Sequence, residues 1–312
     1  YKEKNESGRV GMTELGKSYR AEDILKRAKK LAETYPEHLH YRCAGISHKG
    51  REIPEILLGD AGKCLIVSGG IHGRESINPV LLLRMIEDYV LIRENEYRDP
   101  ALDEGQQLLS EYSICFLPLM NPDGYEIALG KLEKTGDLPL QEAIQKADYA
   151  EWKENGRGVD INRNFPCRSF LPRKGMPQPA SEPETRALMQ VFEKYPESVG
   201  YIDFHSRGRV IYYYRHAMPR SYNRVGKRMA KYLQKKSGYA IGKRREERNT
   251  KMDGGNSVNY YSETCGKLAL TVETVEDDAR FPLDVSYQQE TYREIRWLPL
   301  VYLKERKKCR VK

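Results

Sequence analysis

Residues 64–75 read Cys-Leu-Ile-Val-Ser-Gly-Gly-Ile-His-Gly-Arg-Glu, an apolar run followed by two side chains that can bind a metal ion. The run from Cys64 to Ser68 predicts a buried strand, and the two glycines predict its end. His72 and Glu75 follow at the mouth of this strand, where an imidazole and a carboxylate can turn toward one ion. Hydrolases commonly bind zinc through three ligands of the His, His and Glu kind and leave a fourth position for water. We therefore expect a third ligand at another strand end.

His205 has the position expected of that third ligand, because it closes the apolar run from Val199 to Phe204. An H-x-x-E pair also occurs often by chance, and the alternative interpretation is an ordinary loop. Further motifs in a consistent order favour the metal site. They are Asn121-Pro122-Asp123-Gly124-Tyr125, Gly158 to Phe165, Ser181-Glu182-Pro183-Glu184, and Glu273 within Leu270 to Thr274. The other histidines lack such a context and are interpreted as surface or packing residues: His38, His40, His48 and His216.

With these motifs the chain resembles the zinc metallocarboxypeptidases, the family of carboxypeptidases A and B. The resemblance covers residues 69–276. It implies that His72, Glu75 and His205 bind one zinc ion per chain. It also implies a peptidase activity in which a metal-bound water attacks the substrate carbonyl.

The same resemblance assigns the terminal carboxylate of the substrate to Arg74, Asn162 and Arg163. Arg163 presents a planar fork that suits bidentate carboxylate recognition, which a lysine would perform less well. The alternative is an arginine on a solvated loop, which is common in a chain this basic. The position of Arg163 between two asparagines of the motif favours substrate binding.

Glu273 is the candidate general base. It ends the apolar, β-branched run from Leu268 to Val272, where partial desolvation would raise the proton affinity of a carboxylate. Such a group can take the proton of the attacking water and deliver it to the leaving amine. The alternative interpretations are a surface strand residue or the salt-bridge partner of an arginine, and the resemblance favours catalysis.

Two positions depart from the pattern of the digestive members of the family. Those enzymes hold the carbonyl oxygen with an arginine that follows a tryptophan, and the corresponding dipeptide here is Trp152-Lys153. Lys153 supplies a charge without a fork, and Arg157 is the nearby alternative for this catalytic role. The family also places a mobile tyrosine shortly before a Gly-Gly-Ser turn, but residues 249–257 contain no tyrosine. Tyr260 or Tyr261 is the possible substitute.

The segment after His205-Ser206 bears on the substrate. Arg207 stands where the digestive enzymes usually have an aromatic residue, and we expect it to bind substrate. More arginines and a tyrosine run follow in Arg209, Tyr212-Tyr213-Tyr214, Arg215 and Arg220. A cationic edge beside the metal favours a substrate with more negative charge than one carboxylate. The alternative is an ordinary solvated strand-loop face. Val258 falls at the side-chain selecting position, and because it is not acidic, selection for Lys or Arg ends is not expected.

Bacterial relatives that cleave γ-D-glutamyl-diaminopimelate bonds in cell-wall peptides share further motifs with this chain, namely Trp152-Lys153, Gly158-Val159-Asp160 and Asn162-x-x-Phe165-Pro166. Diaminopimelate brings an extra carboxylate, so cell-wall peptides are the preferred substrate class. A conventional carboxypeptidase that releases C-terminal residues is the alternative. A catalytically silent binding module on the same fold is the second alternative, although such modules usually lose a ligand or the base.

Composition limits the remaining possibilities. The chain of 312 residues has a net charge of +8, no apolar run long enough to span a bilayer and no recognisable nucleic-acid motif. We therefore expect a peptide substrate and an anionic partner such as cell wall, and neither nucleic acid nor a membrane span; the oligomeric state stays open. Six cysteines without C-x-x-C spacing are read as free thiols, with Cys64 and Cys115 in the core, and favour the cytoplasm. No signal peptide is visible, but the chain starts at Tyr1, and a secreted form follows if a leader was removed.

Alternating strand and helix patterns predict one α/β catalytic domain over residues 1–312, with residues 1–20 as a flexible or wrapping segment. Its centre should be a mixed, mostly parallel twisted sheet with helices on both faces. Ligands of such folds gather beyond the carboxyl ends of the strands. Residues 99–107 and 131–150 are expected to be connections. The expected helices are 21–35, 79–89, 181–192, 222–236 and 288–303, and the expected strands are 52–59, 63–68, 112–118, 200–204, 209–214 and 267–273.

Overall fold

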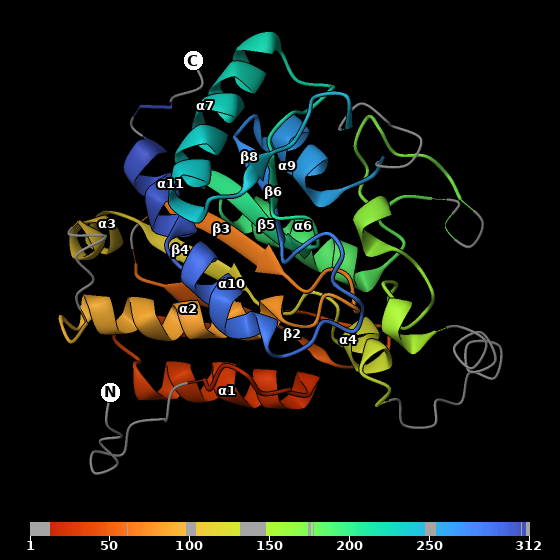
Figure 1. Cartoon of the computed structure of the whole chain (residues 1–312), viewed down its shortest axis with the longest axis horizontal. Helices are drawn as coiled ribbons and strands as arrows, with labels where there is room; N and C mark the ends of the chain where they lie inside the picture. The colour runs from red at the N-terminus through yellow and green to blue at the C-terminus, as the bar shows by residue number, and fades with distance from the viewer. Residues whose placement is uncertain are drawn as a thin grey trace.

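Four parallel strands form the centre of the sheet in the computed structural model (Figure 1). In spatial order they are β4 (Ser113–Leu117), β3 (Cys64–Gly69), β5 (Gly200–Ser206) and β8 (Ala269–Thr274). All residues of β3, β4 and β5 are buried, as expected of strands covered on both faces. The structure describes residues 13–60, 62–97, 104–131, 148–173, 176, 178–246, 254–306 and 308–309.

Shorter or antiparallel strands complete the sheet on both sides. β1 (Leu39–Ile46) and β2 (Glu52–Leu58) form a hairpin that joins β4, whereas β6 (Val210–Tyr212) and β7 (Ala240–Ile241) extend the sheet beyond β8. β2 runs antiparallel to β4, and β6 runs antiparallel to β8. The eight strands therefore form one mixed sheet with a parallel centre, which confirms the predicted fold class.

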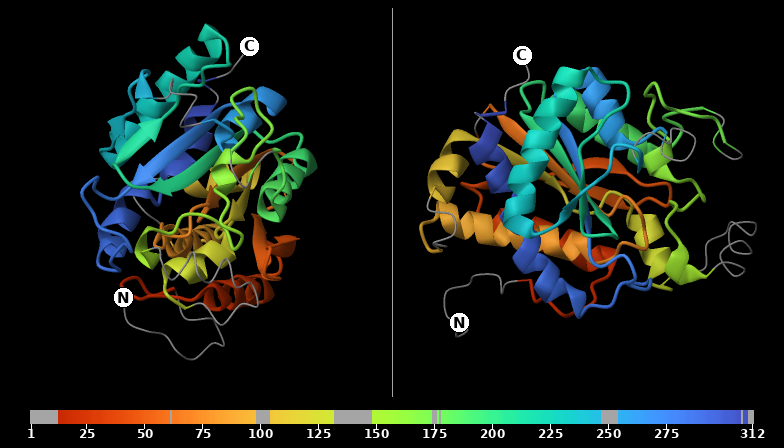
Figure 2. Two further views of the ribbon diagram at one scale, coloured as in Figure 1. Left: turned by 90° about the vertical axis from the view of Figure 1, so that its right-hand side faces the viewer. Right: turned by 45° about the horizontal axis from the view of Figure 1, so that its top comes forward.

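Helices cover both faces of this sheet (Figure 2). The first face, which holds the larger hydrophobic cluster, packs against α1 (Ala21–Thr34), α2 (Asn78–Arg93), α7 (Arg220–Ser237), α10 (Tyr287–Ile295) and α11 (Leu298–Arg306). The second face packs against α6 (Pro183–Lys194) and α9 (Ser257–Cys265). The shorter helices are α3 (Gly105–Glu111), α4 (Pro122–Ala128) and the 3₁₀ turns η2 (Tyr149–Glu151) and η3 (Ile161–Arg163).

The alternation of side chains along β5 selects the face on which the site lies. Ile202 and Phe204 pack into the cluster of the first face, so Asp203 and His205 point to the second face. Glu273 of β8 pairs with His205 in the parallel ladder and points the same way. Backbone pairing therefore brings a histidine and a carboxylate side by side at the carboxyl ends of two neighbouring strands.

The prediction of one helix over residues 288–303 is wrong. The segment forms α10 and α11, which are separated at Arg296 and Trp297. Pro299 near the start of α11 lacks the N–H group that a continuous helix would need at this position. The chain also forms β1, β7, α3, α4 and α9, which the apolar patterns did not predict.

The expected connections and the amino-terminal segment are described in part. Residues 1–12, 98–103 and 132–147 lie outside the described residues. Residues 104–107 belong to the turn before α3 and to α3 itself rather than to a plain connection, and η2 overlaps the end of the second expected connection. Residues 13–20 pack against the body of the fold, because Thr13 donates two hydrogen bonds to Glu87 of α2 and Arg20 pairs with Glu126 of α4.

The six cysteines are all unpaired, and Cys64 and Cys115 are buried in β3 and β4 as predicted. Burial raises the pKa of both thiols, which suits inert core residues. No helix in the described residues has the length and apolar character required to cross a membrane.

Candidate metal centre

Three side chains from two strand ends converge on one point, as the sequence predicted. His72, Glu75 and His205 are buried, and each offers a ligand atom within 4.8 Å of the ligand atoms of the others. His72 and Glu75 lie in the loop after β3, and His205 lies near the end of β5. Because β3 and β5 are parallel neighbours, their carboxyl ends meet at the same edge of the sheet.

The loop that holds His72 and Glu75 is fixed by the Asn-Pro-Asp-Gly motif at the start of α4. Asn121 donates a hydrogen bond to the carbonyl of Ile71 (3.0 Å) and accepts one from the backbone N–H of Gly124 (2.9 Å). Gly73 packs directly on Gly124, and a Cβ atom at residue 73 would lie 2.2 Å from the Gly124 carbonyl oxygen. Only glycine fits at the centre of this H-G-R-E turn without moving one of the two loops.

The outer nitrogens of both histidines face carboxylates, of which Asp203 is fully buried and Asp160 is partly exposed. The Nε2 atom of His205 lies 2.9 Å from Asp203, and the Nε2 atom of His72 lies 3.3 Å from Asp160. Carboxylates in this position fix the tautomer and the ring orientation of a metal-binding histidine. The proton of each neutral ring then belongs on Nε2, and both Nδ1 lone pairs point inward.

The inward-facing atoms form a set that fits a divalent cation. The two Nδ1 atoms lie 3.3 Å apart, and a Glu75 oxygen lies 3.1 Å from the Nδ1 atom of His205. Tetrahedral zinc with bonds of about 2.0–2.1 Å separates its ligand atoms by about 3.3 Å. The third pair, Nδ1 of His72 and Oε1 of Glu75, is closer at 2.6 Å. Two acceptor nitrogens and a carboxylate require a shared cation, so the residues present fit zinc.

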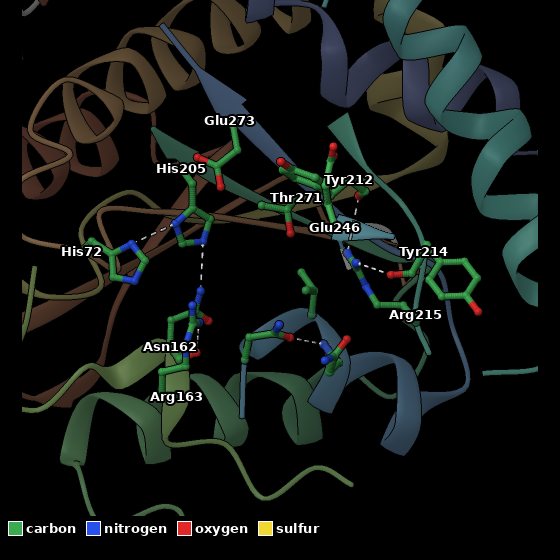
Figure 3. A pocket seen from close by; sticks show the side chains of 13 residues that line it. His72, Asn162, Arg163, His205, Tyr212, Tyr214, Arg215, Glu246, Thr271 and Glu273 are labelled. Atoms are coloured by element: carbon green, nitrogen blue, oxygen red, sulfur yellow. Dashed lines mark hydrogen bonds between the residues drawn. The ribbon is translucent and has the colours of Figure 1, made fainter. Parts of the chain in front are cut away.

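Glu273 lies beside this centre and lines the same pocket as His72 and His205. The pocket has a volume of about 240 Å³ (Figure 3). Its wall is formed by His72, Asn162, Arg163, His205, Tyr212, Tyr214, Arg215, Glu246, Asn256, Val258, Asn259, Thr271 and Glu273. Burial raises the pKa of Glu273 to about 7, and the negative charge of Glu75 acts in the same direction. The carboxylate can therefore exchange a proton near neutral pH.

Asn162 and Arg163 enter the pocket from η3. The side-chain oxygen of Asn162 accepts a hydrogen bond from the backbone of Ser257, and its nitrogen faces the His205 ring at 3.4 Å. Arg163 donates to the carbonyl of Asn162 (2.8 Å). Val258, the expected side-chain selecting position, also lines the pocket.

The other basic residues that were expected at the site lie outside the lining of this pocket, within the described part of the chain. Arg74 pairs with Glu151 (2.6 Å) and lies over the ring of Phe281. Arg207 lies over the same ring. Their expected role in substrate binding stays a prediction.

Lys153 and Arg157, the two alternatives for the carbonyl-oxygen partner, both pair with acidic residues. The Nζ atom of Lys153 lies 2.6 Å from Asp160, and Arg157 pairs with Glu182. Asp160 therefore connects Lys153 to His72, whereas Glu182, the ion-pair partner of Arg157, is not a neighbour of either histidine in the described ion pairs.

The two tyrosines proposed as substitutes for the mobile residue are buried in the hydrophobic cluster of the second face. Tyr260 packs against Phe165 with ring centroids 5.8 Å apart, and the hydroxyl of Tyr261 bonds to that of Ser198 (2.8 Å). Residues 249–253 of the stretch that was expected to hold a tyrosine lie outside the described residues.

Several functional residues were missed at the sequence level. Asp203 precedes His205 by two positions, and the two-residue period of a strand could have placed it on the same face. Asp160 lies within a quoted motif but was not recognised as a partner of His72. Glu246 gave no signal, because it lies in a charged segment, residues 243–248, that contains neither an apolar run nor a recognised motif.

Comparisons with known proteins agree with this geometry. A family model described as zinc carboxypeptidase matches residues 24–296. "Gamma-D-glutamyl-L-diamino acid endopeptidase 1" from Lysinibacillus sphaericus is 27% identical over 210 residues, which cover 61% of this chain and 51% of that protein. "Carboxypeptidase N catalytic chain" from Rattus norvegicus is 28% identical over 193 residues, covering 55% of this chain and 39% of that protein. The chain therefore spans about half or less of these relatives.

Solved structures show the same fold. The crystal structure of thrombin activatable fibrinolysis inhibitor superposes with a TM-score of 0.75 at 19% identity, covering 94% of this chain and 75% of that one. At this level of identity the likeness supports the fold alone.

Proposed function

This chain belongs to the zinc carboxypeptidase family, and from that premise we propose that it is a zinc-dependent peptidase that hydrolyses an amide bond next to a residue with a free carboxylate. The observation that carries the proposal is the shared pocket of His72, His205, Arg163 and Glu273. It places a metal centre, a carboxylate-binding group and a proton acceptor around one space large enough for an amino-acid side chain.

Each residue around the pocket has a separate role in the proposed reaction. Bound zinc lowers the pKa of a water molecule from about 16 to roughly 7 and polarises a carbonyl group. Glu273 takes a proton onto its carboxylate and then delivers it to the departing amine, a task that suits a group whose pKa lies near 7. Arg163 and Asn162 hold the carboxylate of the leaving residue. The carboxylates of Asp203 and Asp160 keep both histidine rings oriented.

The charges of the pocket favour a cell-wall peptide of the γ-D-glutamyl-diaminopimelate type. Arg215 is buried, and its guanidinium donates to the carbonyls of Tyr214 (2.9 Å) and Ala269 (3.2 Å) at the pocket wall. Glu246 lines the same pocket (Figure 3). The side chain of diaminopimelate ends in an ammonium and a carboxylate, which match one acidic and one basic partner. The relative from Lysinibacillus sphaericus is named for a diamino acid, which supports this substrate class.

A conventional carboxypeptidase that releases single C-terminal residues is the second candidate. The similarity to the carboxypeptidase N catalytic chain and the apolar Val258 in the pocket favour it. The residues argue against a catalytically silent module, because the three metal ligands lie together and Glu273 lines the same pocket as His72 and His205.

A substrate panel tests the proposal. The zinc-loaded protein should cleave L-Ala-γ-D-Glu-diaminopimelate faster than the same peptide ending in lysine, which lacks the distal carboxylate, and a chelator should abolish both activities. Faster release of apolar or acidic C-terminal residues from ordinary α-peptides would favour the conventional carboxypeptidase. Cleavage that persists in metal-free protein would contradict both.

A further inference from the structure

A second concave surface adjoins the pocket and is strongly basic. This basic groove has a volume of about 680 Å³ and lies between the amino-terminal half of α7 and the segment after β7. Its lining is Tyr213, Tyr214, Met218, Arg220, Asn223, Arg224, Lys227, Ile241, Gly242, Lys243 and Arg244. Five of these residues are Lys or Arg, and none is Asp or Glu.

The cations of the groove lie in an ordered row. Arg220, Arg224 and Lys227 are spaced by four and three residues along α7, which places them on one face of the helix. Exposed Lys231 continues this row. With a rise of about 1.5 Å per residue, the row spans about 16 Å, with a charge every ~4.5–6 Å.

Within the described residues, these charges have no acidic partner. The five cationic residues of the groove are exposed, and in the part of the chain that the structure describes none of them pairs with a carboxylate. By contrast, Lys26 and Lys30 of α1 each pair with a glutamate. Uncompensated cations in one groove attract a polyanion, because binding releases the counterions condensed on that polyanion.

The groove connects to the catalytic pocket through Tyr214. This residue lines both cavities, and the guanidinium of Arg244 lies 4.8 Å from the centre of its ring. A polymer held along α7 would therefore pass close to the peptide that enters the pocket.

The described lining of the groove has no exposed aromatic ring for base stacking and no exposed large apolar side chain for insertion into a bilayer. Tyr213 and Tyr214 are buried, so they offer no exposed stacking platform for single-stranded nucleic acid. The exposed large hydrophobic residues of the described chain are Ile46, Tyr149 and Leu171, and none of them lines the groove. An apolar face that could enter a bilayer is therefore missing at this surface.

We propose that the basic groove binds a linear phosphodiester polymer without bases, of the kind found in bacterial cell walls, and so anchors the enzyme beside its peptide substrate. A repeat of six backbone bonds, as in poly(glycerol phosphate), spans at most about 7 Å and can follow the row of cations when partly contracted. The idea of an anchor rests on the proposed function, but the binding itself does not.

The test is the binding of fluorescently labelled poly(glycerol phosphate) to the whole 312-residue chain, loaded with zinc, at several salt concentrations. The variant R220Q/R224Q/K227Q removes three charges with residues that favour helix. The matched control K26Q/K30Q/K63Q removes the same charge from exposed positions outside the groove. The groove variant should bind roughly 10- to 100-fold more weakly, and its dependence of log K on log salt should be shallower by about 2. The control should stay within about threefold of the parent protein.

Three results would overturn the proposal. The first is equal binding by the groove variant and the control. The second is tighter binding of a DNA homopolymer or of anionic lipid vesicles, and the third is equal binding of a polyuronate. Hydrolysis of a small soluble peptide is measured in parallel. Because binding needs no turnover, an inactive protein that still binds the polymer would contradict the proposed function alone.

Discussion

Asp203 shows how a single buried side chain can determine the properties of a metal centre. Its two oxygens accept hydrogen bonds from Ser68 and Ser257 (2.6 Å each), and one of them faces the His205 ring at 2.9 Å. Both serines come from elements that border the site, so the carboxylate is held from two sides. His205 therefore has one preferred orientation, with its Nδ1 atom toward Glu75.

The substitution Asp203→Asn should weaken zinc binding by roughly 10- to 100-fold, because the amide holds the ring less firmly and makes it a poorer ligand. Competition with a chromophoric chelator measures the affinity. Asp88→Asn is a matched control, since Asp88 is also buried and hydrogen bonded, to Tyr292, but lies far from the metal donors in the fold. Equal zinc affinity in all three proteins would contradict this role of Asp203.

The substitution Glu273→Gln should reduce kcat by at least ~10²-fold while zinc content stays at one ion per chain, because the amide can no longer take up a proton. Steady-state kinetics and metal analysis on the same sample separate the two effects. Glu246→Gln, which alters another pocket carboxylate, should change the preference among substrates more than kcat. An unchanged rate for Glu273→Gln would revive the interpretation as a silent binding module.

At the residue scale, short motifs were sufficient to predict the metal ligands and the general base. His72 and Glu75 were predictable because one short loop holds them, and His205 and Glu273 because each ends an apolar run. Arg215 was recognised only as one of several arginines. Its place in the pocket depends on α7, where Asn223 bonds both to the backbone N–H of Arg215 (2.7 Å) and to its carbonyl (3.0 Å). A contact between residues eight positions apart across a turn leaves no periodic pattern.

At the scale of elements, the loop between β3 and α2 joins the metal donors to the rest of the fold. Its close packing on α4 depends on the absence of a side chain at Gly73. The predicted buried strands became β3, β4, β5 and β8 because continuous apolar runs suit the centre of a parallel sheet. β1 and β7 escaped prediction, since their half-exposed residues follow no apolar pattern and their pairing comes from neighbouring strands.

The substitution Gly73→Ala should destabilise the protein by roughly 1–3 kcal/mol and reduce zinc affinity, because the added methyl group must push the two loops apart. Chemical denaturation of the metal-free protein measures the first effect, and chelator competition measures the second. Gly62→Ala is the control, because a Cβ atom at residue 62 meets no atom within 4 Å. A Gly73→Ala protein as stable as the control would show that the loops adjust at little cost.

At the scale of the whole molecule, the metal centre connects segments that are distant along the chain. Residues 72–75 and residue 205 belong to different strand ends. The contacts of His205 with His72 and Glu75 therefore do not exist in the unfolded chain. Zinc binding should therefore add to the free energy of unfolding by about 4 kcal/mol when zinc exceeds its dissociation constant ~1,000-fold.

For a chain of this length we expect metal removal to lower Tm by roughly 5–10 °C and zinc to restore it. Differential scanning calorimetry with and without chelator provides the measurement. The variant His205→Ala, which lacks one ligand, should melt at the same temperature in both conditions. A parent protein whose melting is insensitive to zinc would show that the three side chains do not bind the ion together.

The ladder between β5 and β8 links recognition to chemistry. Thr271 and Glu273 both line the pocket and stand two residues apart on one strand, about 6.6 Å along the same face. Because both residues belong to one strand of the sheet, loop motion cannot change the distance between Thr271, which lines the wall of the pocket, and Glu273, the general base. Variants of this protein with another substrate preference should therefore differ in the loops around the pocket, while the spacing of Thr271 and Glu273 along β8 stays the same.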